Sequence, residues 1–161
     1  MKDLKSLFRS FMYAFKGLGW MISHERNFRI HLTVLGFLLY FLIRFDYFAL
    51  TGTQVAILVL TSALVLASEM INTAIEKTND AATKERNEAV KVAKDVAAGA
   101  VLVFAISSVL VGVSILWQPE AFKSLYTYFT GNLLSIALLV AMIIISLIFI
   151  FKFDFNKKEK K

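Results

Sequence analysis

The residues between positions 69 and 80 combine types and spacings that could support chemistry. They follow a long uncharged run, and four of them stand three, four and four residues apart: Glu69, Asn72, Glu76 and Asp80. On an α-helix, at 100° per residue, these four fall within a sector of about 80°. One face of the helix would then present three carboxylates and an amide, a set that can bind a cation or carry a proton.

The predicted position of Glu69 within the membrane is the main reason to expect a function for this row. The uncharged run before it covers residues 47–68, and about 20 residues suffice to cross the apolar core of a bilayer. Glu69 should therefore lie one to two turns inside the membrane boundary, where an unpaired charge costs about 2.5–3.5 kcal/mol or more. A residue placed at such a cost has a partner or a task. An alternative is a packing network in which Asn72 and the carboxylates only join helices.

Two further polar clusters are predicted to reach the same depth from other helices. They are Glu25, Asn27, Arg29 and His31 before the first predicted span, and Lys94 and Asp95 at the start of the third. Carboxylates from different helices suit Mg²⁺, particularly when phosphate oxygens complete its shell, and a lysine can balance phosphate charge. His31 by itself is more typical of an interfacial, hydrogen-bonded histidine. These residues alone predict a site for a polyanion or a cation.

The elements that must position these residues are membrane spans. Of the 161 residues, 58% are hydrophobic and only 19% are charged, which disfavours a soluble domain. Three uncharged runs are long enough to span a bilayer: residues 47–68, 96–119 and 124–151. A fourth apolar stretch, residues 30–43, reaches spanning length when extended to Leu50. We therefore predict an all-α integral membrane protein with four spans, three of them in the segment that carries the polar clusters.

Positive charge predicts how the spans are oriented. Sixteen of the 18 Lys and Arg residues stand before the first span, between the second and third, or after the fourth. This alternation places both termini in the cytoplasm. The net charge of +6 therefore belongs to membrane topology and anionic lipid rather than to nucleic acid. The chain has no cysteine, which excludes disulfides and zinc–thiolate sites, and we expect no signal peptide.

Outside the spans, residues 3–20 are predicted to form an amphipathic helix on the membrane surface, because apolar residues recur at helical spacing. Gly17 and Gly19 are expected to end it, and residues 23–29 to form a polar hinge. The second span should start near Thr53 and continue as a helix through Asp80. Residues 83–87 are expected to form a turn, residues 117–129 an extracytoplasmic interfacial connection, and residues 156–161 a frayed tail.

Four blocks of the sequence carry a resemblance to a known family. They lie at residues 10–18, 25–31, 69–76 and 93–101, and include Glu25-x-x-Phe28-Arg29, Glu69-x-x-Asn72-x-x-x-Glu76 and Lys94-Asp95. Over about residues 1–118 they resemble the small prokaryotic diacylglycerol kinase family, in the form of its undecaprenol kinase branch. Residues 119–161 lie outside the resemblance. We therefore expect a lipid kinase domain at 1–118 and an additional C-terminal helix with a basic tail at 119–161.

The resemblance implies a homotrimer in the bacterial cytoplasmic membrane, with active sites between neighbouring subunits. It implies Mg²⁺-dependent transfer of the γ-phosphate of ATP to the hydroxyl of a membrane lipid. Glu69 would be the catalytic base, and Glu25 and Glu76 would bind the metal. ATP would be contacted by Tyr13, Glu25, Glu76, Lys94 and Asp95, and the site supported, or the substrate bound, by Arg29, Asn72 and Asp80.

Undecaprenol is the favoured acceptor on this resemblance, and diacylglycerol is the alternative. Two other classes of function stay open. In a transporter, Glu69 would carry a proton or cation within the membrane, which leaves the clusters at Glu25 and Lys94 unexplained. In a non-catalytic subunit, the polar residues would serve helix packing alone.

Overall fold

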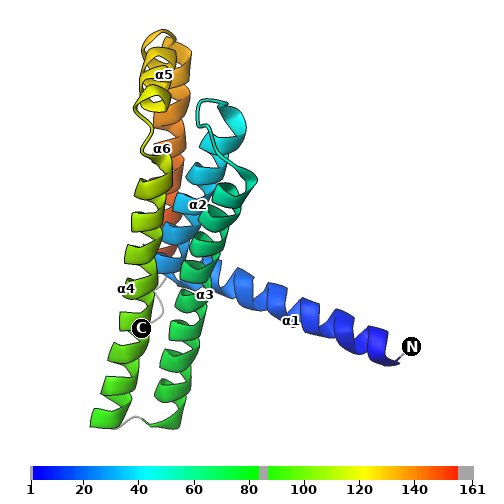
Figure 1. The fold of residues 1–161 in the computed structure, drawn as a ribbon. Helices are drawn as coiled ribbons and strands as arrows, with labels where there is room; N and C mark the ends of the chain where they lie inside the picture. Colours follow the sequence, from blue (N-terminus) through cyan, green and yellow to red (C-terminus); the bar gives the residue numbers. More distant parts are fainter. Residues whose placement is uncertain (1, 84–86, 156–161) are drawn as a thin grey trace.

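The structure, a computed structural model, describes residues 2–83 and 87–155, and within these ranges it is built of helices (Figure 1). The helices in chain order are α1 (Lys2–His24), α2 (Arg26–Arg44), α3 (Gly52–Ala82), α4 (Glu88–Leu116), α5 (Pro119–Thr130) and α6 (Leu133–Phe155). Within this described part, α2, α3, α4 and α6 are long and apolar enough to cross a membrane. The prediction of an all-helical protein with four such helices is thereby confirmed. The predicted turn lies largely in residues outside the described ranges, as does the predicted tail.

Two predicted boundaries of the first span are wrong. α2 begins at Arg26, inside the expected hinge, and ends at Arg44 rather than at Leu50. Phe45 leaves the helix with an extended backbone, because its ring is buried among other aromatic rings instead of continuing along the helix axis. The length needed to span a bilayer is therefore gained at the start of α2.

The expectation that two glycines end the first helix is also wrong. α1 continues through Gly17 and Gly19 to His24, and the break before α2 is confined to Glu25, whose backbone is extended. A glycine inside a helix costs only about 1 kcal/mol relative to alanine. Packing beyond the glycines offsets this cost, because Met21 is buried and Trp20 lies under the ammonium of Lys77, 5.4 Å from the ring centre.

The four long helices form an elongated bundle in which α3 and α4 lie antiparallel along most of their length (Figure 1). α2 packs against α3 on one side and α6 on the other, so α6 reaches the bundle mainly through α2. α1 leaves the bundle sideways from the start of α2, and the α3–α4 hairpin extends beyond that point. We call the half of the bundle with the α1–α2 junction and the α3–α4 turn the polar half.

The opposite end of the bundle is rich in aromatic rings, contributed by the end of α2 and by α5. Phe45 lies edge-on to Tyr128 with ring centres 5.0 Å apart. The guanidinium of Arg44 lies over both rings and donates a hydrogen bond of 3.3 Å to the hydroxyl of Tyr128. Aromatic rings with a polar edge are typical of membrane boundaries, which agrees with the interfacial connection predicted there.

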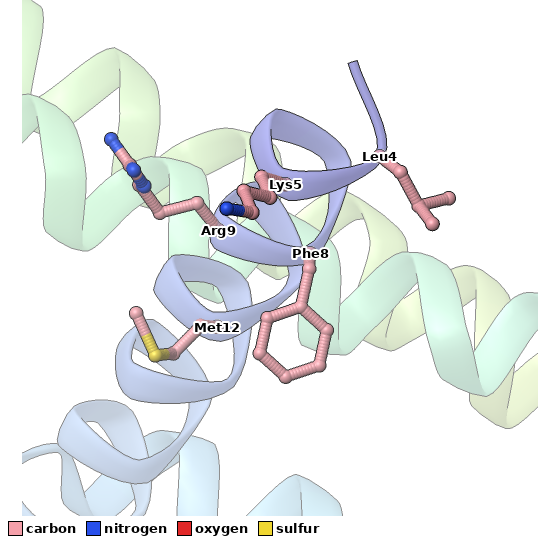
Figure 2. A pocket seen from close by; sticks show the side chains of 5 residues that line it. All are labelled: Leu4, Lys5, Phe8, Arg9 and Met12. Atoms are coloured by element: carbon pink, nitrogen blue, oxygen red, sulfur yellow. The ribbon is translucent and has the colours of Figure 1, made fainter. Parts of the chain in front are cut away.

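α1 exposes a row of large apolar side chains beyond the part that packs on the bundle. The fully described members of this row include Leu4, Leu7, Phe8, Phe11 and Phe15, each more than half exposed. Figure 2 shows Phe8 and Met12 on the same stretch of helix as the long side chains of Lys5 and Arg9, around a shallow hollow. Such an arrangement fits a helix that lies flat in a membrane interface, with its cationic ends directed to water.

The surface position of α1 can be tested because the chain has no cysteine of its own. We expect an environment-sensitive fluorophore on Phe8→Cys to show blue-shifted emission in vesicles, because that position would lie among acyl chains. The matched control is Ser6→Cys, which is about 160° away around the helix and should emit as in water. Equal spectra at the two positions would contradict an interfacial α1.

Candidate functional site in the polar half of the bundle

The polar row of α3 begins with a buried carboxylate. Glu69 is 4% exposed, and its neighbours Ser68 and Thr73 are buried as well. Ser68 satisfies its hydroxyl locally by donating to the carbonyl of Val65 at 2.8 Å. Glu69 is therefore a carboxyl group that the fold shields from solvent.

His31 of α2 is the partner that the fold brings to Glu69. Its Nε2 lies 3.6 Å from Oε1 of Glu69, and its side chain is 26% exposed. The sequence placed His31 among the polar residues before the first span but did not single it out for the site. Only the packing of α2 on α3 could reveal this contact, since the two residues are 38 positions apart.

The contact between His31 and Glu69 also indicates the level of the two predicted metal ligands. Glu25 precedes His31 by six residues, and Glu76 follows Glu69 by seven. Since α2 and α3 run in opposite directions, both steps lead toward the same end of the bundle, by about 9 and 10 Å respectively. Glu25, just before α2, and Glu76, on α3, therefore lie at similar depth, and both are partly buried.

Asn72 makes a hydrogen bond to Glu76 with its amide nitrogen, while its amide oxygen is buried without a partner among the described residues. Its Nδ2 donates to Oε1 of Glu76 at 3.1 Å, which orients that carboxylate. Its Oδ1 is buried, and no hydrogen-bond partner is found for it among the described residues. A buried carbonyl oxygen without a partner is costly unless a donor or a cation completes it.

This donor set fits Mg²⁺. The ion prefers oxygen ligands and is bound in proteins by one or two carboxylates, with waters and phosphate oxygens filling the shell. Glu25, Glu76 and Asn72 carry such oxygens, and Asn72 contacts Glu76 from one turn away on α3. Within residues 2–83 and 87–155, no group of three or more His, Asp or Glu gathers into a metal cage of its own. A Mg²⁺ ion bound here would take the rest of its shell from water or phosphate oxygens.

Asp80 and Lys94 join α3 to α4 near the turn between them. The ammonium of Lys94 donates a hydrogen bond to Oδ1 of Asp80. Asp80 lies eleven residues beyond Glu69, past the uncharged part of α3, and this hydrogen bond lowers the pKa of its carboxyl. The ammonium stays one-third exposed and can exchange this partner for another anion.

The remaining predicted residues are placed differently. Tyr13 is 61% exposed on the projecting part of α1, under the ammonium of Lys16, and Asp95 is exposed on α4. Within the single chain, Tyr13 stands twelve residues before Glu25, or about 18 Å along α1. Arg29 is fully buried, with its guanidinium on backbone carbonyl oxygens. The single chain thus joins the α3 row to His31 and Lys94.

A groove beside this row was not foreseen from the sequence. It has a volume of about 280 Å³, lies between α1 and α3, and is lined by Gly17, Trp20, Met21, Met70, Thr73, Ala74 and Lys77. Its α3 residues occupy the face next to that of Glu69 and Glu76, since Thr73 stands four residues after Glu69. The groove is largely apolar and open on one side. It could take an apolar chain whose head lies near the carboxylates.

Comparisons with known proteins add to this geometry. The family model of prokaryotic diacylglycerol kinases matches residues 12–116, which include all the predicted site residues. The chain belongs to this family. The matched segment contains the polar row that begins at Glu69, the block around Glu25, and the pair Lys94-Asp95. Helices α5 and α6 lie beyond it.

Two curated relatives of the kinase family are similar to the chain. A diacylglycerol kinase of Synechocystis is 41% identical over 115 residues, which cover 71% of this chain and 64% of that protein. The undecaprenol kinase of Bacillus subtilis is 34% identical over 119 residues, which cover 70% of this chain and 89% of that protein. The chain thus spans a little under two thirds of the length of the Synechocystis relative. No solved structure matches the chain significantly.

The pair of Lys94 and Asp80 leads to a prediction about nucleotide binding. If Lys94 serves an anion, Lys94→Met should weaken the binding of Mg·ATP, whereas Asp80→Asn should leave it unchanged or tighten it, because the ammonium is then released from its internal partner. The measurement is the affinity for a fluorescent ATP analogue in lipid nanodiscs. Equal losses in both variants would indicate that the pair only joins α3 to α4.

Proposed function

We propose that the protein phosphorylates a membrane lipid alcohol with ATP and Mg²⁺, and that undecaprenol is the acceptor. The observation that carries the proposal is the buried carboxylate of Glu69, with His31 3.6 Å away and an apolar groove on the adjoining face of α3. Membership in the kinase family supports the class of reaction. This reading makes the polar half of the bundle cytoplasmic, where ATP is found, and the membrane a bacterial cytoplasmic membrane.

In the proposed reaction, the oxygen of the lipid hydroxyl attacks the γ-phosphorus of ATP, and Glu69 accepts the proton of that hydroxyl. The bond between the γ-phosphorus and the bridging oxygen breaks, and ADP leaves. His31 holds the carboxylate of Glu69 in place from the neighbouring helix. Phosphoryl transfer requires mainly positioning and neutralisation of charge, so a base fixed by its packing is well suited to it.

The other residues bind the nucleotide. Glu25 and Glu76 would hold Mg²⁺, with Asn72 orienting Glu76 and offering its open Oδ1. The ion would neutralise phosphate charge and fix the γ-phosphate in line with the acceptor. Lys94 would supply a further positive charge once a phosphate replaces Asp80. Tyr13 and Asp95, which are exposed in the single chain, are proposed to reach ATP in a homotrimer with sites between subunits.

The choice of acceptor rests on the chemistry of the groove. A polyprenol brings one polar group, its hydroxyl, whereas diacylglycerol also brings two esters that need polar surroundings. Apart from Thr73 and Lys77, the groove is lined by apolar side chains and glycine, or by the ring of Trp20. This favours the polyprenol. Diacylglycerol is the second candidate, favoured by the 41% identity with the Synechocystis relative.

The first test addresses the base. Glu69→Gln keeps the shape of the side chain but cannot accept the proton, so lipid phosphorylation should fall by about 10²-fold or more. The measurement is transfer of label from γ-labelled ATP to lipid by the purified protein in nanodiscs. Glu120→Gln, an exposed carboxylate on α5 at the aromatic end, is the control and should keep full activity. Near-normal turnover by Glu69→Gln would refute the assignment.

The second test addresses the acceptor. When undecaprenol and diacylglycerol compete at equal concentration in the same nanodiscs, we expect most of the label in undecaprenyl phosphate. The comparison uses one enzyme preparation, so folding and ATP binding are the same for both lipids. Label mainly in phosphatidic acid would replace undecaprenol by diacylglycerol. Proton-coupled flux without any labelled lipid would favour a carrier instead.

A further inference from the structure

Arg29 is the most deeply buried charged side chain among the described residues, at 0% exposure. Its guanidinium contacts backbone from two other helices. Nε and Nη2 donate to the carbonyl oxygen of Ile150 in α6 at 3.1 and 2.8 Å, and Nη1 donates to the carbonyl oxygen of Ile22 in α1 at 3.1 Å. One side chain of α2 thereby connects α1, α2 and α6.

The chemistry of these contacts explains why the residue is an arginine. Removing a guanidinium from water costs several kcal/mol unless its donors are satisfied. Its planar fork can place two N–H groups on one oxygen and a third on another, which the compact ammonium of lysine cannot do in a fixed geometry. Ile22 is in the last turn of α1, where helical carbonyls lack partners and carry partial negative charge. Arg29 therefore stabilises the end of α1.

The contacts of Arg29 converge on the segment that carries Glu25. The backbone N–H of Arg29 donates to the carbonyl oxygen of Glu25 at 3.2 Å, and that of Glu25 donates to the carbonyl oxygen of Met21 at 2.9 Å. Glu25 is the single extended residue between α1 and α2. Its direction is thus set by how these two helices meet, and Arg29 fixes that junction from within.

The helix that accepts from Arg29, α6, lies outside the family match. The family match ends at residue 116, so the carbonyl of Ile150, which accepts two hydrogen bonds from Arg29, belongs to a helix outside the matched segment. α6 packs mainly on α2, on the side away from α3. At Ile150, the C-terminal part of α6 therefore lies against the α1–α2 junction.

We propose that α6 acts as an internal support for the nucleotide site, and that Arg29 is the positioning residue through which it orients Glu25. The inference rests on the proposed function, in which Glu25 binds Mg·ATP. Loss of the Arg29 contacts should misplace Glu25 and loosen the α1 side of the groove, while leaving Glu69 in place on α3. The KM for Mg·ATP should then rise, with a smaller rise in the KM for the lipid alcohol.

The test uses the full chain in nanodiscs with Arg29→Met, Arg29→Lys and the control Arg26→Met, an exposed arginine on the same helix. We expect the KM for Mg·ATP to rise about tenfold in Arg29→Met, an effect typical of losing a residue that supports a ligand. Arg29→Lys should fall in between, because the charge remains but the fork is lost. Arg26→Met should match the parent protein. A purely structural role would lower the amount of active enzyme without this change in KM.

A second measurement tests the role of Arg29 without depending on the proposed kinase activity. Nitroxide labels on Leu18→Cys in α1 and Leu147→Cys in α6, both outward-facing, report the distance between the two helices. The distribution should be narrow in the parent and in Arg26→Met, and broad in Arg29→Met. If the parent phosphorylates no lipid alcohol, the proposed function fails while the labels still test the connection. An unchanged distribution, or an unchanged KM for Mg·ATP in an active Arg29→Met enzyme, overturns the inference.

Discussion

The buried carboxylate of Glu69 is the constraint on which the rest of the structure depends. A carboxylate held at 4% exposure beside an apolar span needs a polar neighbour, and His31 of α2 provides it at 3.6 Å. That contact lies where α2 packs on α3. Because the two helices run in opposite directions, Glu25 and Glu76 lie at similar depth. The predicted base and the predicted metal ligands thus lie in the part of the bundle where α2 packs on α3.

Apart from this polar half, the bundle buries little apolar surface within the single chain. Most of the apolar side chains of α4 and α6 face outward, such as Val109 at 65% and Ile145 at 65% exposure. In a membrane these surfaces meet lipid or other subunits, so they do not drive folding as they would in water. Specific polar contacts between helices then contribute more to setting how the helices are arranged. The contact of His31 with Glu69, the pair of Asp80 and Lys94, and the buried Arg29 each join different helices.

Arg29 connects the segment that matches the kinase family to helix α6, which lies outside that match. The predicted site residues lie in the matched segment and α6 lies beyond it, and hydrogen bonds from the guanidinium of Arg29 to backbone connect the two parts. Backbone acceptors make this connection independent of the side chain at Ile150. A helix can therefore be joined to a buried donor through its backbone carbonyl, without a particular side chain of its own.

The sequence by itself determined the four apolar helices and the polar face of α3, because both follow from local spacing and from the cost of charge in an apolar medium. The motifs also identified the family. Tertiary structure alone decided which partner meets Glu69, how α1 continues past Gly17, and that Arg29 is satisfied by carbonyls of α1 and α6. These features depend on contacts between residues far apart in the chain. A backbone carbonyl, moreover, has no signature in the sequence, since every residue carries one.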